Sequence, residues 1–132
     1  MCQATPEAQL MLPSSEQSPS VAREWATRSG CSTHRMTVRD EALLLISELI
    51  TNSVVHGGPP IVLAIECDEA LLRVRVRDGS PVAPVPRRAS PEDEHGRGMT
   101  LVDLLTDTWG VDPVADEHGP GKAIWFELRR AG

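Results

Sequence analysis

The chain is poor in aromatic residues and contains neither paired cysteines nor long apolar runs. Its 132 residues include no tyrosine, one phenylalanine and three tryptophans, so aliphatic side chains must fill most of the core. Cys2, Cys31 and Cys67 are far apart and form no CxxC pair, which indicates reduced thiols rather than a disulfide framework or a zinc site. No apolar run approaches the roughly 18 residues of a membrane span, and no secretory signal precedes the first elements. We therefore expect a soluble, cytoplasmic protein.

The charge balance argues against a nucleic-acid partner. The formal net charge is -6 and the pI is about 5.1, whereas general nucleic-acid binders carry basic surfaces. A helical DNA-binding regulator is therefore disfavoured. The length and the 40% of hydrophobic residues suit one domain with one core. We predict a disordered tail over residues 1–8 and a single domain over residues 9–130.

Hydrophobic periodicity and turn residues predict a mixed helix and strand order. The predicted helices cover residues 18–30, 40–56 and 99–108. The predicted strands cover residues 9–12, 61–67, 72–77, 109–114 and 122–129. Ser18 before Pro19 provides a side-chain acceptor at a helix start. Residues 79–98 lack periodicity, and a loop of that length is usually a functional lid or a disordered segment.

The helix over residues 40–56 carries a polar stripe on an otherwise apolar segment. Glu48, Asn52 and His56 are spaced four apart, so they drift only about 40° around the helix at each step. A carboxylate beside a carboxamide offers oxygen ligands to a hard cation, and the carboxylate also accepts a proton. The stripe could equally be the solvated side of an amphipathic helix, with the opposite face packed on a sheet.

Two further polar features lie at junctions between predicted elements. Asp78 ends a strand just where the chain enters the long loop. Gly96, Arg97 and Gly98 precede a helix, where glycines let backbone N–H groups approach an anion and the arginine adds a donor fork suited to phosphate. A lone GxG pattern is weak, because such glycines are often simple turn residues.

In this order, the segments resemble the GHKL (Bergerat-fold) ATP-binding family, shared by histidine kinases, gyrase-type ATPases and Hsp90. ELITNSVVHGGPP is similar to its Asn box, VRVRDGSP to its first glycine box and HGRGMTLVDLLTDTWG to its second. GPGKAIWFEL is similar to the closing strand of the short anti-sigma-factor serine/threonine kinases. The resemblance runs from about Leu12 to Arg129. It implies an α/β fold, more closely an α+β two-layer sandwich, whose mixed or antiparallel sheet is covered on one face by about three helices.

The resemblance also implies a role for each matching residue. Asn52 would ligate the Mg²⁺ that bridges the ATP phosphates, and Glu48 would act as the general base. Asp78 would accept a hydrogen bond from the adenine amino group, with Gly79 beside it.

The remaining cofactor-binding positions follow from the same resemblance. Gly96, Arg97, Gly98 and the following Met99 would cradle the phosphates while the 79–98 loop closes over them. Lys122 and His56 match positions near the nucleotide only loosely, and a structural role suits each of them better.

Three positions depart from the family pattern. The glycine box usually reads D-x-G-x-G, but Ser80 and Val82 stand at its later glycines. Ala123 stands where relatives often carry a threonine that helps to hold the base. These departures bear on affinity more than on the identity of the nucleotide.

The resemblance predicts an ATP-dependent protein serine/threonine kinase that regulates transcription by partner switching. Its expected partners are a STAS-type anti-sigma antagonist and a sigma factor, and a homodimer is a further expectation. Met11, Leu12, Val21 and Trp25 are candidates for the dimer contact, although a core position suits Val21 and Trp25 better. The alternative is a non-catalytic module that binds ATP or ADP and docks a partner, and a simple ATPase is a third reading.

Overall fold

The computed structural model describes residues 8–29, 39–67, 71–81 and 101–129. The strands are β1 (Ala8–Leu12), β2 (Ile61–Cys67), β3 (Leu71–Asp78), β4 (Thr108–Asp116) and β5 (Gly119–Arg129). The helices are α1 (Ser18–Ser29) and α3 (Arg39–Asn52), which continues into the π-helical turn Ser53–Gly57, and residues 101–105 are also helical. Every predicted strand is present, and so are the predicted helices within the described residues, but the helix predicted over residues 99–108 ends at residue 105, and Thr108 already belongs to β4.

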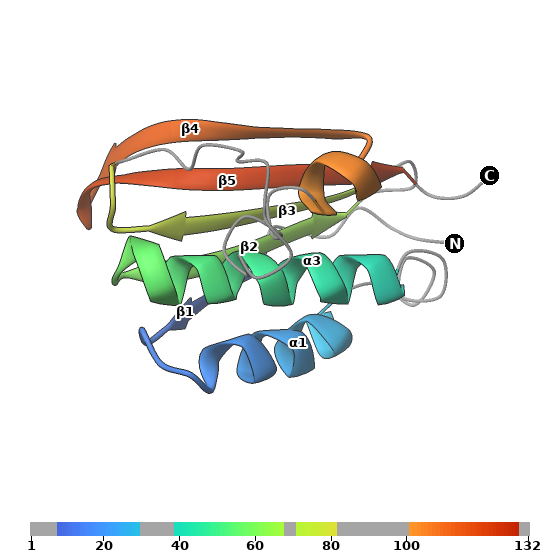
Figure 1. The fold of residues 1–132 in the computed structure, drawn as a ribbon, viewed down its shortest axis with the longest axis horizontal. Helices are drawn as coiled ribbons and strands as arrows, with labels where there is room; N and C mark the ends of the chain where they lie inside the picture. The colour runs from blue at the N-terminus through green and yellow to red at the C-terminus, as the bar shows by residue number, and fades with distance from the viewer. Residues whose placement is uncertain (1–7, 30–38, 68–70, 82–100, 130–132) are drawn as a thin grey trace, which may run out of the picture.

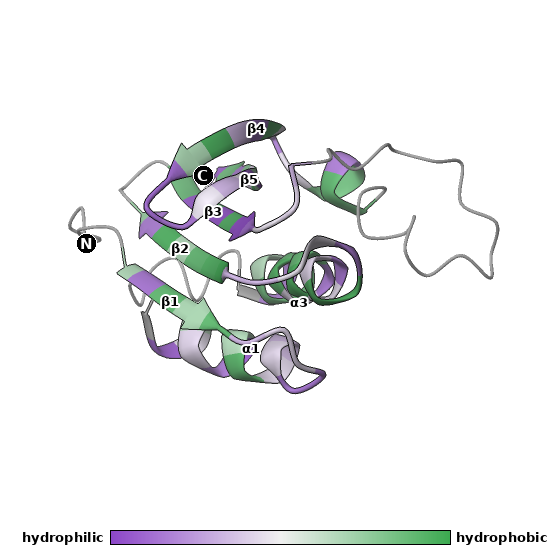
Figure 2. Ribbon diagram, turned by 90° about the vertical axis from the view of Figure 1, so that its left-hand side faces the viewer, coloured by the Kyte–Doolittle hydropathy of each residue, from purple (hydrophilic) through white to green (hydrophobic). Residues whose placement is uncertain are grey.

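The five strands form one antiparallel sheet in the order β1-β2-β3-β5-β4. Two hairpins, β2–β3 and β4–β5, are joined where β3 pairs with β5, so Asp78 lies opposite Lys122. The strand β1 adds to the free edge of β2. All the helices lie on one side of this sheet (Figures 1 and 2). The predicted α+β two-layer sandwich is confirmed, and its sheet is antiparallel.

The core lies between α3 and the inner face of the sheet. The apolar stripe of α3 is buried as predicted: Ala42, Leu45, Ile46, Leu49 and Ile50 are each 4% exposed or less. The strand β3 alternates, with Leu72, Val74 and Val76 inside while Arg73 and Arg75 are exposed. Each fully buried aliphatic side chain contributes roughly 1.5–3 kcal/mol, so this interface fixes α3 on the sheet.

Several local predictions are wrong. Val21 was expected in the core but is 47% exposed, because Ala22 and Ala26 form the buried side of α1. Leu12, a candidate for a dimer contact, is 3% exposed and belongs to the core. The hydroxyl of Ser18 donates to the Pro13 carbonyl at 2.5 Å rather than capping the helix as an acceptor, which ties the start of α1 to the end of β1.

The first six residues of the second glycine box, 95–100, lie outside the described residues. Gly96, Arg97, Gly98 and Met99 fall in the segment 82–100, as does most of the predicted lid. Their roles therefore stay predictions.

Candidate functional site

The carboxylate of Asp78 is the centre of a buried polar cluster. Its residue is 1% exposed, and its Oδ1 accepts hydrogen bonds from the Lys122 ammonium at 2.9 Å and from the Ser80 backbone N–H at 3.0 Å. Its Oδ2 accepts a hydrogen bond from the Ser53 hydroxyl at 3.1 Å. Lys122 itself is only 4% exposed, so the two residues form a buried ion pair. Loss of either partner would leave an unpaired charge away from water, which strongly destabilises the fold.

The end of α3 is widened where it meets Asp78. The Gly58 N–H donates to the Ser53 carbonyl at 2.8 Å, a bond across five residues that defines a π-helical turn. This turn directs Ser53 inward, where it is 1% exposed and reaches Asp78. The regular stripe predicted from Glu48 to His56 is therefore wrong beyond Asn52.

Glycines let two chain segments approach Asp78, and the residue after Asp78 approach a third segment, more closely than any side chain would allow. A Cβ on Gly57 would stand 2.3 Å from the Asp78 Oδ2, and a Cβ on Gly121 would stand 2.2 Å from the Asp78 carbonyl oxygen. A Cβ on Gly79 would meet the Pro59 carbonyl oxygen at 2.2 Å. The backbone after Asp78 thus turns against the segment that follows α3, although Ser80 replaces the expected glycine.

Arg77 fastens the closing hairpin to the same end of β3. Its guanidinium donates to both carboxylate oxygens of Asp116, at 3.0 and 2.7 Å, to the Gly119 carbonyl at 2.6 Å and to the Asp78 carbonyl at 2.9 Å. The hydrogen bonds from Arg77 to Asp116, together with the one from the His118 backbone N–H, hold the pKa of the Asp116 carboxyl below its ordinary value. Strand alternation predicts an exposed Arg77, yet it is 3% exposed because its donors are satisfied internally.

Glu48 and Asn52 form the second part of the candidate site. Both are half-buried on the last turns of α3, and Asn52 directly precedes Ser53. Neither side chain has a hydrogen bond or ion pair among the described residues. Within the same residues no three His, Cys, Asp or Glu side chains gather as a metal cage. A carboxamide oxygen with a neighbouring carboxylate nevertheless suits Mg²⁺, which keeps several waters and takes few protein oxygens.

Sequence reasoning found Asp78 but missed the contacts that surround it. Lys122 was expected to have a structural role near the nucleotide, whereas the structure brings its ammonium directly onto Asp78. Ala123, in place of the expected threonine, is fully buried opposite Arg77 in the strand register. The pairing of β3 with β5 places Lys122 beside Asp78 and Ala123 beside Arg77. These neighbours can be predicted only when the order of the strands is known.

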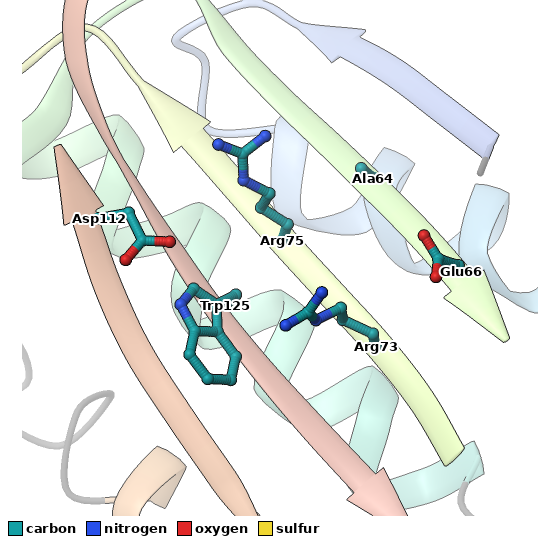
Figure 3. Close-up of a pocket in the computed structure, with 6 residues that line it drawn as sticks. All are labelled: Ala64, Glu66, Arg73, Arg75, Asp112 and Trp125. Atoms are coloured by element: carbon teal, nitrogen blue, oxygen red, sulfur yellow. The ribbon is translucent and has the colours of Figure 1, made fainter. Parts of the chain in front are cut away.

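The outer face of the sheet carries a separate hollow of about 250 Å³ (Figure 3). Its lining residues are Ala64, Glu66, Arg73, Arg75, Asp112 and Trp125. The Arg73 guanidinium lies over the Trp125 ring, 5.1 Å from its centroid, and pairs with Glu127 at 3.1 Å. This hollow faces away from the helices and includes none of the predicted site residues.

The antiparallel sheet with its helical layer on one face defines a two-layer α+β domain with a buried acid at the end of β3. The model of the histidine kinase-like ATPase domain matches residues 14–127, and the chain belongs to that family. The resemblance to GHKL ATPases is thereby confirmed, and ATP is the ligand that the family indicates. A comparison with the curated proteins found no match. No helix among the described segments is both long and apolar enough to cross a membrane.

Proposed function

We propose that the protein is an ATP-dependent protein serine/threonine kinase that phosphorylates a small STAS-type anti-sigma antagonist. In this role it also holds a sigma factor on another surface, and phosphorylation of the antagonist switches the partner. The observation that carries the proposal is Glu48, a half-buried carboxylate without a partner among the described residues, one helical turn before Asn52. Nucleotide binding alone does not require a base at this position.

The chemistry assigned to these side chains is an in-line phosphoryl transfer. The carboxylate of Glu48 accepts the proton of a substrate serine or threonine hydroxyl as its oxygen forms a bond to the γ-phosphorus. The bond from the γ-phosphorus to the bridging oxygen breaks, and the electron pair leaves with ADP. Asn52 would hold the Mg²⁺ that accompanies ATP, and this ion supplies charge to offset the phosphate oxygens. Asp78 orients the base end of the nucleotide.

Phosphotransfer assays on matched variants test the proposal. With a cognate STAS-type antagonist, Mg²⁺ and labelled ATP, the wild-type chain should label a serine or threonine, and Glu48→Gln should lower the rate at least about 100-fold. Glu41→Gln is the control, because it makes the same change at an exposed position in the first turn of α3. Labelling that persists in Glu48→Gln would remove the proposed base.

The role of Asn52 is tested by binding rather than by turnover. Calorimetry should show that Asn52→Ala weakens Mg-ATP far more than it weakens ATP in the presence of EDTA. Thr51→Ala is the neighbouring control, since the Thr51 hydroxyl is exposed and already donates to the Ser47 carbonyl. Equal losses with and without Mg²⁺ would assign Asn52 to the fold and not to the ion.

A second candidate is a regulatory module that binds ATP or ADP and docks a partner without phosphoryl transfer. The departures at Ser80, Val82 and Ala123 favour it, because each stands where the family pattern has a residue that helps to hold the nucleotide. Tight Mg-ATP binding with no label on any antagonist and no release of phosphate would select this reading. A cytoplasmic location and a homodimer are part of both proposals.

A further inference from the structure

The ammonium group of Lys122 has more donors than the described residues use. A lysine ammonium carries three N–H donors. One of them goes to Oδ1 of Asp78 at 2.9 Å, and the described part of the chain offers Lys122 no other hydrogen-bond acceptor. Buried polar groups are nearly always paired, and the Lys122 side chain is only 5% exposed. The remaining donors are therefore suited to a ligand bound beside Asp78.

Hydrogen bonds from the described residues fill three acceptor positions of the Asp78 carboxylate and leave one. An ionised carboxylate offers about four acceptor positions. Among the described residues, Oδ1 accepts from Lys122 and from the Ser80 backbone, while Oδ2 accepts from the Ser53 hydroxyl alone. The main chain of Gly57 packs against this second oxygen, so that an added Cβ would stand only 2.3 Å from it. A carboxylate acceptor and an ammonium donor thus stand next to each other at one buried point.

We propose that Lys122 is a specificity-determining residue that lets the site accept purines with a carbonyl at C6 nearly as well as adenine. The proposal deepens the proposed function, because it assumes that the base of a nucleoside triphosphate lies against Asp78. The C6 amino group of adenine donates to the open position on Oδ2. The C6 carbonyl of hypoxanthine or guanine accepts from the Lys122 ammonium instead.

A lone aspartate at this point would discriminate between the two bases. A carbonyl oxygen placed against a buried carboxylate finds no donor, and the loss of a hydrogen bond to a charged group corresponds to roughly 10- to 150-fold in affinity. The ammonium of Lys122 removes that penalty, since it stands within hydrogen-bond distance of the carboxylate that reads the base.

Inosine triphosphate is the probe that isolates this contact, because it carries the C6 carbonyl without the C2 amino group of guanine. Calorimetric titration of the full chain with Mg-ATP and Mg-ITP should give dissociation constants within about tenfold of each other. In Lys122→Met the ratio of the ITP constant to the ATP constant should rise by about 10- to 100-fold. Arg73→Met is the control, as it removes a cation from the outer face of the sheet and should leave the ratio unchanged.

The outcomes separate the two proposals. Tight ATP binding with ITP more than 100-fold weaker in the wild-type chain overturns the role of Lys122 and leaves the proposed function intact. An unchanged ratio in folded Lys122→Met overturns it as well. If neither nucleotide binds, the proposed function fails and the inference fails with it. The wild-type ratio decides the question even if Lys122→Met does not fold.

Discussion

The buried pair of Lys122 and Asp78 makes a quantitative prediction for stability. Lys122→Met leaves the Asp78 carboxylate 1% exposed and without its cation, and removal of one partner of a buried ion pair costs about 3–5 kcal/mol. The free energy of unfolding of a domain of this size is roughly 5–15 kcal/mol, so the variant should still fold but should be much less stable. Since 1 kcal/mol shifts Tm by about 3–5 °C at this length, we expect Tm to fall by about 10–20 °C.

A double-mutant cycle separates the ion pair from general damage to the fold. Asp78→Asn keeps an oxygen acceptor for Lys122 and should cost about 2–3 kcal/mol. The double variant Asp78→Asn/Lys122→Met leaves no unpaired buried charge at this site. Its loss of unfolding free energy should therefore be well below the sum of the losses of the two single variants. The interaction energy between the two substitutions should be at least about 2 kcal/mol, measured by urea denaturation monitored by circular dichroism.

An exposed ion pair in the same sheet supplies the matched comparison. Arg73 and Glu127 are 3.1 Å apart, with side chains 47% and 23% exposed, and such pairs contribute about 0–1 kcal/mol. Arg73→Met should therefore change the free energy of unfolding by less than about 1 kcal/mol. If Lys122→Met costs no more than Arg73→Met, or if the cycle is additive, the reasoning about burial is refuted.

Three other substitutions probe contacts at the site and on the sheet. Gly57→Ala places a Cβ 2.3 Å from Oδ2 of Asp78, so calorimetry should show weakened ATP binding together with an unfolding free energy lower by about 1–3 kcal/mol; unaltered binding would contradict this crowding. The Arg77 guanidinium holds the Asp116 pKa below its ordinary value, so the unfolded chain binds the proton first as pH falls. Stability from this group is present at neutral pH and lost below about pH 4, and Asp116→Asn should show a smaller loss between pH 7 and pH 3 by chemical denaturation. Identical losses in both proteins would rule out that linkage. Gly110→Ala brings a methyl carbon 2.7 Å from an indole carbon of Trp125 on the facing strand, so the ring should move and the near-UV circular dichroism spectrum should change. An unchanged spectrum would show that the ring does not move.

Local periodicity was sufficient to predict the layers of the fold. The alternation around Val74 and the helical spacing around Leu45 each mark one buried face, and burial of those faces leaves few arrangements of one helix on one sheet. The strand limits were also close, because Pro and Gly stand at the ends of the apolar runs. These signals act over a few residues and need no knowledge of distant partners.

The chemistry at the end of β3 was predicted only in part. Asp78 stood out because it ends a strand, but its partner Lys122 is 44 residues away and becomes its neighbour only through the pairing of β3 with β5. The same holds for Arg77, because its carboxylate partner, Asp116, is the last residue of β4, 39 residues later in the chain. The π-helical turn after Asn52 could not be predicted from the apolar pattern. Such a turn adds one residue to the hydrogen-bonded turn of the helix, and the types of residue in the segment do not reveal it.

The glycines around Asp78 allow the main chain, and not side chains alone, to fix the position of its carboxylate. Two distant segments of main chain touch Asp78 at Gly57 and Gly121, and the N–H of Gly79, the next residue, donates to the Gly58 carbonyl. Substitutions in the surrounding side chains can therefore accumulate without displacing it, provided that these three positions stay bare. The ligand preference of the site could therefore be redesigned by substitution of Lys122 and Ser53, while the main chain keeps the Asp78 carboxylate in its position.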